Sequence, residues 1–169
     1  GGERPAPGDE AGLAAGKRAE QTLASRTLDE KLWQLFFVTP EAITKVETAT
    51  LAGEATKAAI ESQPVGGLVY FAKNLENRAQ TVTLLENSQS YSKIPLFLGV
   101  DEEGGLVARL ANNAAFGLPK YESAPPLGAS GHPTDADTLG RPHGGLPADY
   151  GLPAALSPVA ARVTISATT

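Results

Sequence analysis

The amino-acid sequence predicts an α/β fold, because a strand, a helix and a second strand follow one another between residues 67 and 101. A unit of this length is typical of two parallel strands joined by a right-handed helical crossover. Both strand segments are continuously apolar, as expected for strands covered on both faces. Two clear strands and one weaker candidate cannot close a sheet on themselves. We therefore expect the first part of an α/β domain.

The first 24 residues are expected to form a flexible N-terminal arm, since Gly, Ala, Pro and charged residues occur there without an apolar period. Such an arm often separates a removed export signal from its domain, and a cloning remnant would have the same composition. The first residue is Gly rather than Met. An extracytoplasmic or secreted location is therefore one interpretation, and residues 25–169 are expected to form the domain.

Two helices are expected before the first clear strand. Thr27 and Glu30 form a capping-box pattern at the start of the first helix. Apolar residues then recur at helical spacing along one face, at Leu28, Leu32, Leu35 and Phe36. We expect this helix to end before Pro40. A second helix is expected at about residues 53–62.

The strand–helix–strand unit is expected to have strands at residues 67–71 and 96–100. The helix between them is expected at about residues 75–91, with Asn74 as its N-cap. Its length and its two apolar flanking strands together indicate a parallel pair.

Beyond Leu110 the pattern weakens. Residues 111–131 are rich in Gly and Pro and are expected to form a loop, and Gly and Pro also interrupt the helical segment expected at residues 134–150. Residues 154–159 are a candidate third strand.

Composition excludes several classes of function. A chain of 169 residues makes one domain or a piece of a larger one. Its net charge of −5 argues against nucleic acid or an anionic membrane as the main partner, and no apolar run is long enough for a transmembrane helix. The absence of cysteine excludes disulfides and thiolate zinc sites. Dinucleotide and Walker motifs are absent, and no cofactor is predicted.

The most informative segment begins where the second clear strand is expected to end. Asp101, Glu102 and Glu103 are followed by Gly104, Gly105 and, after three more residues, by Arg109. Ligands bind at the carboxyl ends of strands in barrels and open α/β sheets. Carboxylates that accept several hydrogen bonds, beside glycines that allow close backbone approach, suit a polyhydroxylated ligand such as a sugar. Gly104 and Gly105 could also supply positive φ for a sharp turn.

Other interpretations of this segment remain open. If the strand continues, Asp101 and Glu103 share one side of it, but a solvated acidic loop or a carboxylate capping a turn would have the same sequence. Arg109 could orient a substrate, or form a structural ion pair with Asp101 or Glu103. A carboxylate cluster can bind Ca²⁺ or Mg²⁺, but no further oxygen ligands follow at suitable spacing, and no metal site is predicted. Two further titratable residues are interpreted as loop residues, His132 and His143.

Three segments resemble the N-terminal domain of glycoside hydrolase family 3, in the family's order and spacing: TLDEKLWQLF at residues 27–36, VGGLVYF at 65–71, and DEEGG with Arg109 and Leu110. Residues 36–42 and 89–92 look most like bacterial β-N-acetylhexosaminidases. The resemblance covers residues 24–110 well. It implies that residues 25–169 are the N-terminal portion of a (β/α)8 TIM-type barrel, incomplete and with about three βα units.

The resemblance also implies an activity: hydrolysis of terminal β-linked N-acetylhexosamine by a retaining mechanism in the complete domain. Asp101 matches the acid that binds sugar hydroxyls in the −1 subsite, and Arg109 matches an arginine of the same subsite. The implied partner is a β-linked amino-sugar glycan or a peptidoglycan-derived saccharide.

The departures from the family limit this expectation. The Lys-His-Phe-Pro-Gly-His-Gly segment that carries substrate-binding and acid/base residues is absent, as is the Ser-Asp segment that bears the nucleophile, so no catalytic residue is assigned. Pro153, Ala155 and Ala161 replace an Asn and two acids of the third-strand motif, and Leu106 stands where many members have Arg. The chain alone is therefore expected to be inactive. The alternative is a non-catalytic carbohydrate-binding or interaction module.

Overall fold

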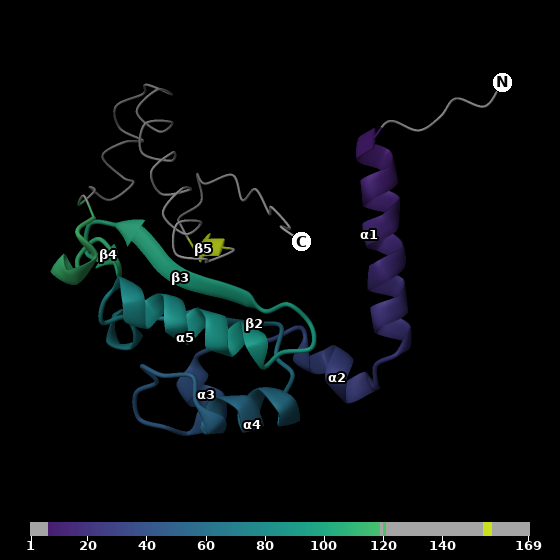
Figure 1. The fold of residues 1–169 in the computed structure, drawn as a ribbon, viewed down its shortest axis with the longest axis horizontal. Helices are drawn as coiled ribbons and strands as arrows, with labels where there is room; N and C mark the ends of the chain where they lie inside the picture. The colour runs from purple at the N-terminus through teal and green to yellow at the C-terminus, as the bar shows by residue number, and fades with distance from the viewer. Residues whose placement is uncertain (1–6, 119, 121–153, 157–169) are drawn as a thin grey trace.

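The computed structural model describes residues 7–118, 120 and 154–156 (Figure 1). In this part of the chain a small sheet is covered by helices on one face. Its parallel strands have the order β1-β2-β3-β5, and a short fifth strand, β4, pairs antiparallel with the end of β3. The strands are β1 (Phe37–Val38), β2 (Gly67–Tyr70), β3 (Phe97–Gly104), β4 (Val107–Ala108) and β5 (Ala154–Leu156).

The helices precede or connect these strands. The α-helices are α1 (Pro7–Ala24), α2 (Leu28–Trp33), α3 (Pro40–Thr44), α4 (Glu54–Ser62) and α5 (Arg78–Ser90), and two 3-10 turns follow β2 and β4, η1 (Ala72–Asn74) and η2 (Ala114–Phe116). The parallel pair of β2 and β3 with α5 between them confirms the expected strand–helix–strand unit. The described part of the chain is thus mixed α/β, as predicted. None of its helices is long and apolar enough to cross a lipid bilayer.

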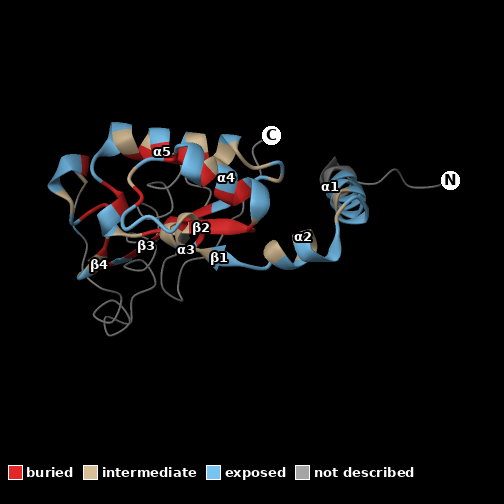
Figure 2. Cartoon of the chain, turned by 90° about the horizontal axis from the view of Figure 1, so that it is seen from below, coloured by how far each residue is buried: buried red, intermediate tan, exposed pale blue. Residues whose placement is uncertain are grey.

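The core lies between the sheet and helices α4 and α5 (Figure 2). Alternate residues of β2 and β3 point into it, as the pleat of a strand requires. These residues are Leu68 and Tyr70 of β2 and Leu98 and Val100 of β3, packed with Ile60 of α4 and with Leu84 and Leu85 of α5. The Tyr70 hydroxyl donates to the Ser88 hydroxyl (3.0 Å), so this buried phenol is satisfied. Its burial raises the pKa of Tyr70 to about 12.

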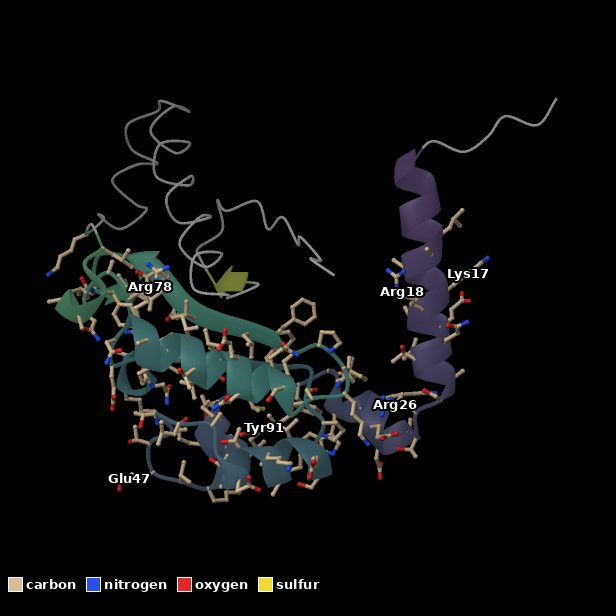
Figure 3. The ribbon with its side chains drawn as sticks, viewed as in Figure 1. Lys17, Arg18, Arg26, Glu47, Arg78 and Tyr91 are labelled. Carbon is tan, nitrogen blue, oxygen red and sulfur yellow. The ribbon has the colours of Figure 1, made fainter. Side chains whose placement is uncertain are left out.

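The prediction of a flexible arm at residues 1–24 is wrong for most of its length, because Pro7–Ala24 form helix α1. The helix has Pro at its first position and is rich in Ala, which has the highest intrinsic helix propensity. Propensity rather than an apolar face accounts for it: the helix is almost wholly exposed from Gly12 onward and stands apart from the sheet (Figure 1). Its cationic residues Lys17 and Arg18 extend into solvent (Figure 3).

The helix expected between Thr27 and Pro40 is shorter than predicted. The capping box at Thr27 is present, but α2 ends at Trp33. Residues 37 and 38 instead pair with β2 as β1, where Phe37 lies opposite Gly67. Pro40 does not stop a helix: it occupies the first turn of α3, where its missing N–H costs nothing, and Thr39 is the N-cap.

The other boundaries agree more closely. Helix α4 confirms the expected helix at 53–62, and β5 lies within the candidate strand at 154–159. Helix α5 starts later than predicted because Asn77, not Asn74, is its N-cap and accepts from the Gln80 N–H (3.0 Å). The histidines His132 and His143, the interrupted segment 134–150 and most of the loop expected to end at residue 131 lie outside the described residues.

Candidate functional site

The candidate site lies at the carboxyl ends of the parallel strands. Because β1, β2 and β3 run in one direction, the residues that follow them come to the same edge of the sheet. Glu41 follows β1, Phe71 and Asn74 follow β2, and Asp101 lies in the last part of β3. This is the edge at which α/β folds bind ligands.

Strand β3 continues through the acidic segment, which separates the three carboxylates. Asp101 and Glu103 lie on one side of the strand, as expected if the strand continued, and Glu102 lies on the other, where it is 2 % exposed. Asp101 is partly buried and Glu103 is exposed. The carboxylates therefore do not converge. Among the described residues no three His, Cys, Asp or Glu side chains are placed to hold a metal ion.

A tight turn brings Arg109 back to Asp101. Gly104 (φ 87°) and Gly105 (φ 57°) adopt the left-handed conformation expected of them, and a bulge in the β3–β4 ladder turns the chain. The Arg109 guanidinium then donates from Nη2 to Oδ2 of Asp101 over 3.1 Å. Of the roles left open for Arg109, pairing with Asp101 is the one that the structure shows. Both side chains are about a quarter exposed, so the pair is accessible from solvent.

The ring of Phe71, which directly follows β2, supports Arg109. The guanidinium carbon lies 5.7 Å from the centre of this ring, which is a cation–π distance. Arg109 Nε is buried and has no hydrogen-bond partner. A partly exposed ion pair by itself contributes little stability. The position of Arg109 is therefore set by the ring and the turn as well as by the carboxylate.

Glu102 has a role that was not predicted from the sequence: it holds the segment that follows Arg109. Its carboxylate accepts from the N–H groups of Leu110 (2.8 Å) and Ala111 (3.1 Å). Both of these residues are buried. The signal was in the sequence: an acid between two residues of one strand face must point to the opposite, buried face.

Glu41 and Asn74 were also missed as members of this region. One carboxylate oxygen of Glu41, Oε1, accepts from Asn74 Nδ2 (2.6 Å) and from the Ala49 N–H (3.0 Å), and Lys73 Nζ lies 3.3 Å from it. Asn74 is fully buried. No local sequence pattern reports these contacts, because the partners are separated by 33 positions in one case and 8 in another.

The Glu41 contacts predict an acid-dependent loss of stability. Burial alone would raise the pKa of Glu41, but hydrogen bonds from the N–H groups of Ala49 and Glu41 itself, from Asn74 and from Lys73 hold it below its usual 4.5. A lowered folded-state pKa stabilises the fold above the unfolded value, and this contribution is lost as the pH falls through the folded value. We expect the thermal midpoint of wild type to fall more steeply below pH 4.5 than that of Glu41→Gln.

The measurement is the thermal midpoint of both proteins by circular dichroism, from neutral pH to about pH 3. The pKa of Glu30 is lowered as well, chiefly by the hydrogen bond from the Thr27 N–H, but Glu30 titrates in both proteins and cancels from the difference. Parallel curves for the two proteins would contradict the role given to Glu41.

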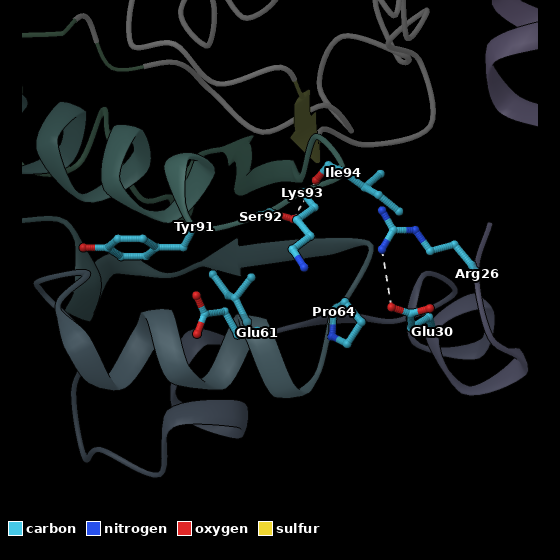
Figure 4. Close-up of a pocket in the computed structure, with 9 residues that line it drawn as sticks. Arg26, Glu30, Glu61, Pro64, Tyr91, Ser92, Lys93 and Ile94 are labelled. Atoms are coloured by element: carbon cyan, nitrogen blue, oxygen red, sulfur yellow. Dashed lines mark hydrogen bonds and ion pairs between the residues drawn. The ribbon is translucent and has the colours of Figure 1, made fainter. Parts of the chain in front are cut away.

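A cavity of about 300 Å³ lies at the other end of the strands (Figure 4). Its walls include the segments that lead into β2 and β3, and the ion pair of Arg26 with Glu30 (3.3 Å) crosses one side of it. Lys93 and Glu61 also face this hollow (Figure 4). Since these are the amino ends of the strands, the cavity is separate from Asp101 and Arg109.

Comparisons with known proteins identify the family of this chain. The sequence matches the family model described as "Glycosyl hydrolase family 3 N terminal domain" over residues 27–166. It is 41% identical over 61 residues to "Beta-hexosaminidase A" of Pseudoalteromonas piscicida, which covers 33% of this chain and 10% of that protein. It is 38% identical over 66 residues to "Beta-hexosaminidase" of Bordetella avium, which covers 39% of this chain and 19% of that protein. The chain thus spans a tenth to a fifth of these relatives.

Solved structures give the same result. A glycoside hydrolase family 3 β-N-acetylglucosaminidase from Paenibacillus superposes with a TM-score of 0.66 at 27% identity, over 79% of this chain and 24% of that one. NagZ from Neisseria gonorrhoeae, in complex with N-trifluoroacetyl-D-glucosamine, superposes with a TM-score of 0.57 over 72% of this chain and 35% of that one. At 21% identity the NagZ match shows the fold alone. With the family match extending over most of its length, the chain belongs to glycosyl hydrolase family 3.

Proposed function

We propose that this chain supplies part of the −1 sugar subsite of a β-N-acetylhexosaminidase. The complete domain would hydrolyse terminal β-linked N-acetylhexosamine with retention of configuration. The observation that carries the proposal is the Asp101–Arg109 pair, which lies at the carboxyl edge of a parallel sheet in a family 3 chain. Its relatives named as β-hexosaminidases support the choice of sugar.

The pair offers the chemistry that a sugar needs. A carboxylate has acceptor capacity for several hydrogen bonds, so Asp101 can accept from a hydroxyl while its Oδ2 remains paired with Arg109. The guanidinium has five N–H donors and can donate to a hydroxyl oxygen on the same face. The proposed ligand is a β-linked amino-sugar glycan, and a saccharide derived from peptidoglycan is one source of it.

The sheet supports a wider proposal about the fold. The order β1-β2-β3-β5, parallel throughout and consecutive along the chain apart from the β3–β4 turn, is the order in which a (β/α)8 barrel begins. We assign β1, β2, β3 and β5 to the first strands of such a barrel. The retaining mechanism needs a nucleophile and an acid/base about 5–5.5 Å apart, and neither is assigned to this chain. We therefore expect no turnover by the chain alone.

Binding of N-acetylglucosamine tests the proposed subsite. In saturation-transfer NMR, we expect a signal from the sugar with wild-type protein and none with Asp101→Ala. Glu103→Ala is the matched control, because Glu103 lies on the same side of β3 but is exposed. Equal signals from the Asp101 variant and wild type would reject the subsite. Release of p-nitrophenol from its β-N-acetylglucosaminide by the purified chain would reject the expectation that catalysis needs residues outside it.

A further inference from the structure

Asn74 joins the segment that follows β1, which includes α3, to the segment that follows β2. Its side chain is fully buried, and both ends of its amide are used. Oδ1 accepts from the Phe71 N–H over 2.9 Å. Nδ2 donates to Glu41 Oε1 over 2.6 Å and to the Ala49 carbonyl over 3.0 Å. Asn74 therefore fixes the backbone of Phe71 and is itself held by the segment that follows β1.

Glu41 is one of three groups that fix which way this amide faces, with the Ala49 carbonyl and the Phe71 N–H. A carboxylate can only accept, so the NH₂ end of Asn74 must face Glu41 and its oxygen must face the Phe71 N–H. A hydrogen bond to an ionised acceptor is also stronger than one between neutral groups. The Glu41 carboxylate is held in turn by the Ala49 N–H, and its side chain is only 10% exposed. Among the partners of Asn74, Glu41 thus supplies the charged acceptor, from a nearly buried position.

Phe71 carries this constraint to the candidate site. Its backbone N–H is the group that Asn74 holds, and its ring lies beneath the Arg109 guanidinium at 5.7 Å. Arg109 in turn contacts Asp101 at 3.1 Å. Each step in the series from Glu41 to Asp101 is a direct contact between described residues.

We infer that Glu41 is a positioning residue for the Asp101–Arg109 pair, acting through Asn74 and the ring of Phe71. Any effect of Glu41 on sugar binding rests on the proposed function. The geometric part, that Glu41 sets the environment of Arg109, does not need the sugar. Glu41 reaches the site only through the two intervening residues.

The test without sugar uses the Arg109 guanidinium signal in ¹H–¹⁵N NMR spectra. The ring current of Phe71 shifts this signal, and Phe71→Leu gives its position without the ring. We expect Glu41→Ala to move the signal toward the Phe71→Leu position. Glu41→Gln, which keeps an acceptor oxygen for Asn74, should restore most of the wild-type position. An unmoved signal in Glu41→Ala, with the β3 amide signals of Leu98 and Val100 showing a folded sheet, would overturn the inference.

Two further variants protect the test against misfolding and against a general charge effect. Lys73→Met removes a half-exposed ammonium that contacts the same Glu41 oxygen but leaves Asn74 in place. Its Arg109 signal should stay at the wild-type position, and a shift as large as that of Glu41→Ala would overturn the route through Asn74. If Glu41→Ala does not fold, Glu41→Asp withdraws the carboxylate by one methylene and should give an intermediate shift. A wild-type position for Glu41→Asp would then count against the inference.

The test with sugar separates this inference from the proposed function. We expect N-acetylglucosamine to bind Glu41→Ala about fivefold more weakly than wild type, which corresponds to about 1 kcal/mol. Binding by Glu41→Gln should be close to that of wild type. If wild type does not bind this sugar, the proposed function fails while the Arg109 signal still decides the positioning role. If wild type binds and Glu41→Ala binds equally well, the positioning role fails alone.

Discussion

Replacement of Glu102 by Ala is expected to lower the free energy of unfolding by about 2–6 kcal/mol. The carboxylate accepts from two N–H groups, those of Leu110 and Ala111, in a buried part of the structure. Leaving a buried donor unpaired costs about 1–3 kcal/mol, and the substitution leaves two without their acceptor. The removed side chain also leaves a cavity, since only 2 % of Glu102 is exposed.

Urea unfolding followed by circular dichroism measures this loss. The matched control is Glu103→Ala, the neighbouring acid on the exposed side of the strand, for which we expect a change within about 0.5 kcal/mol. Glu102→Gln should fall between the two, because its amide has one acceptor oxygen in place of two. If the Glu102 and Glu103 variants unfold at the same urea concentration, the buried position of Glu102 is wrong.

The Glu102 contacts also bear on Arg109. The Glu102 carboxylate, in β3, holds the N–H groups of Leu110 and Ala111, the two residues that directly follow Arg109. The backbone is therefore fixed on both sides of the β3–β4 turn. A loss of these bonds should therefore broaden or shift the Arg109 NMR signal as well. The two faces of this strand thus have different roles: Asp101 contacts Arg109 on one face, and on the other Glu102 holds the segment after the turn that positions Arg109.

The site could be predicted where its pattern is local. The alternation of a strand places Asp101 and Glu103 on one side, paired glycines allow the left-handed turn, and the spacing from Asp101 to Arg109 matches the hairpin that joins them. The pairing of Arg109 with Asp101 rather than with Glu103 could not be predicted, because it depends on the bulge between Glu102 and Gly104.

The fold could be predicted where burial follows a repeating pattern in the sequence. It could not be predicted where a contact with a distant segment determines the local structure. Residues 37 and 38 are a strand because β2 lies beside them, so Pro40 was a misleading marker for the end of the helix that begins after Thr27. Helix α1 has no apolar face to detect and forms from propensity alone. Asn74 resembles a helix cap in sequence, but its amide is taken by Glu41, Ala49 and Phe71, and the cap moves to Asn77. Each error arose from a contact between distant residues or from a signal other than periodicity.

Substitution of Gly66 by Ala is expected to destabilise the chain by about 3 kcal/mol or more. A methyl group there would overlap the carbonyl oxygen of Gln34, at the end of α2. This neighbour is backbone and cannot rotate away. It is also held in place, because the Gly66 N–H donates to the carbonyls of Trp33 (3.2 Å) and Phe36 (3.1 Å), and Gln34 Nε2 donates to the Pro64 carbonyl (2.7 Å).

The destabilisation by Gly66→Ala should therefore extend to the pairing of β1 with β2. Moving the end of α2 away from Gly66 would also move β1, which begins three residues after Gln34 and pairs with β2 at Gly67. Gly16→Ala in α1 is the matched control, because a methyl group there meets nothing within 4 Å and Ala favours a helix over Gly by about 0.5–1 kcal/mol. Urea unfolding should separate the two variants clearly, with Gly16→Ala at or above the wild-type midpoint. A wild-type midpoint for Gly66→Ala would mean that the end of α2 does not pack against this turn, and the assignment of β1 beside β2 would lose its support.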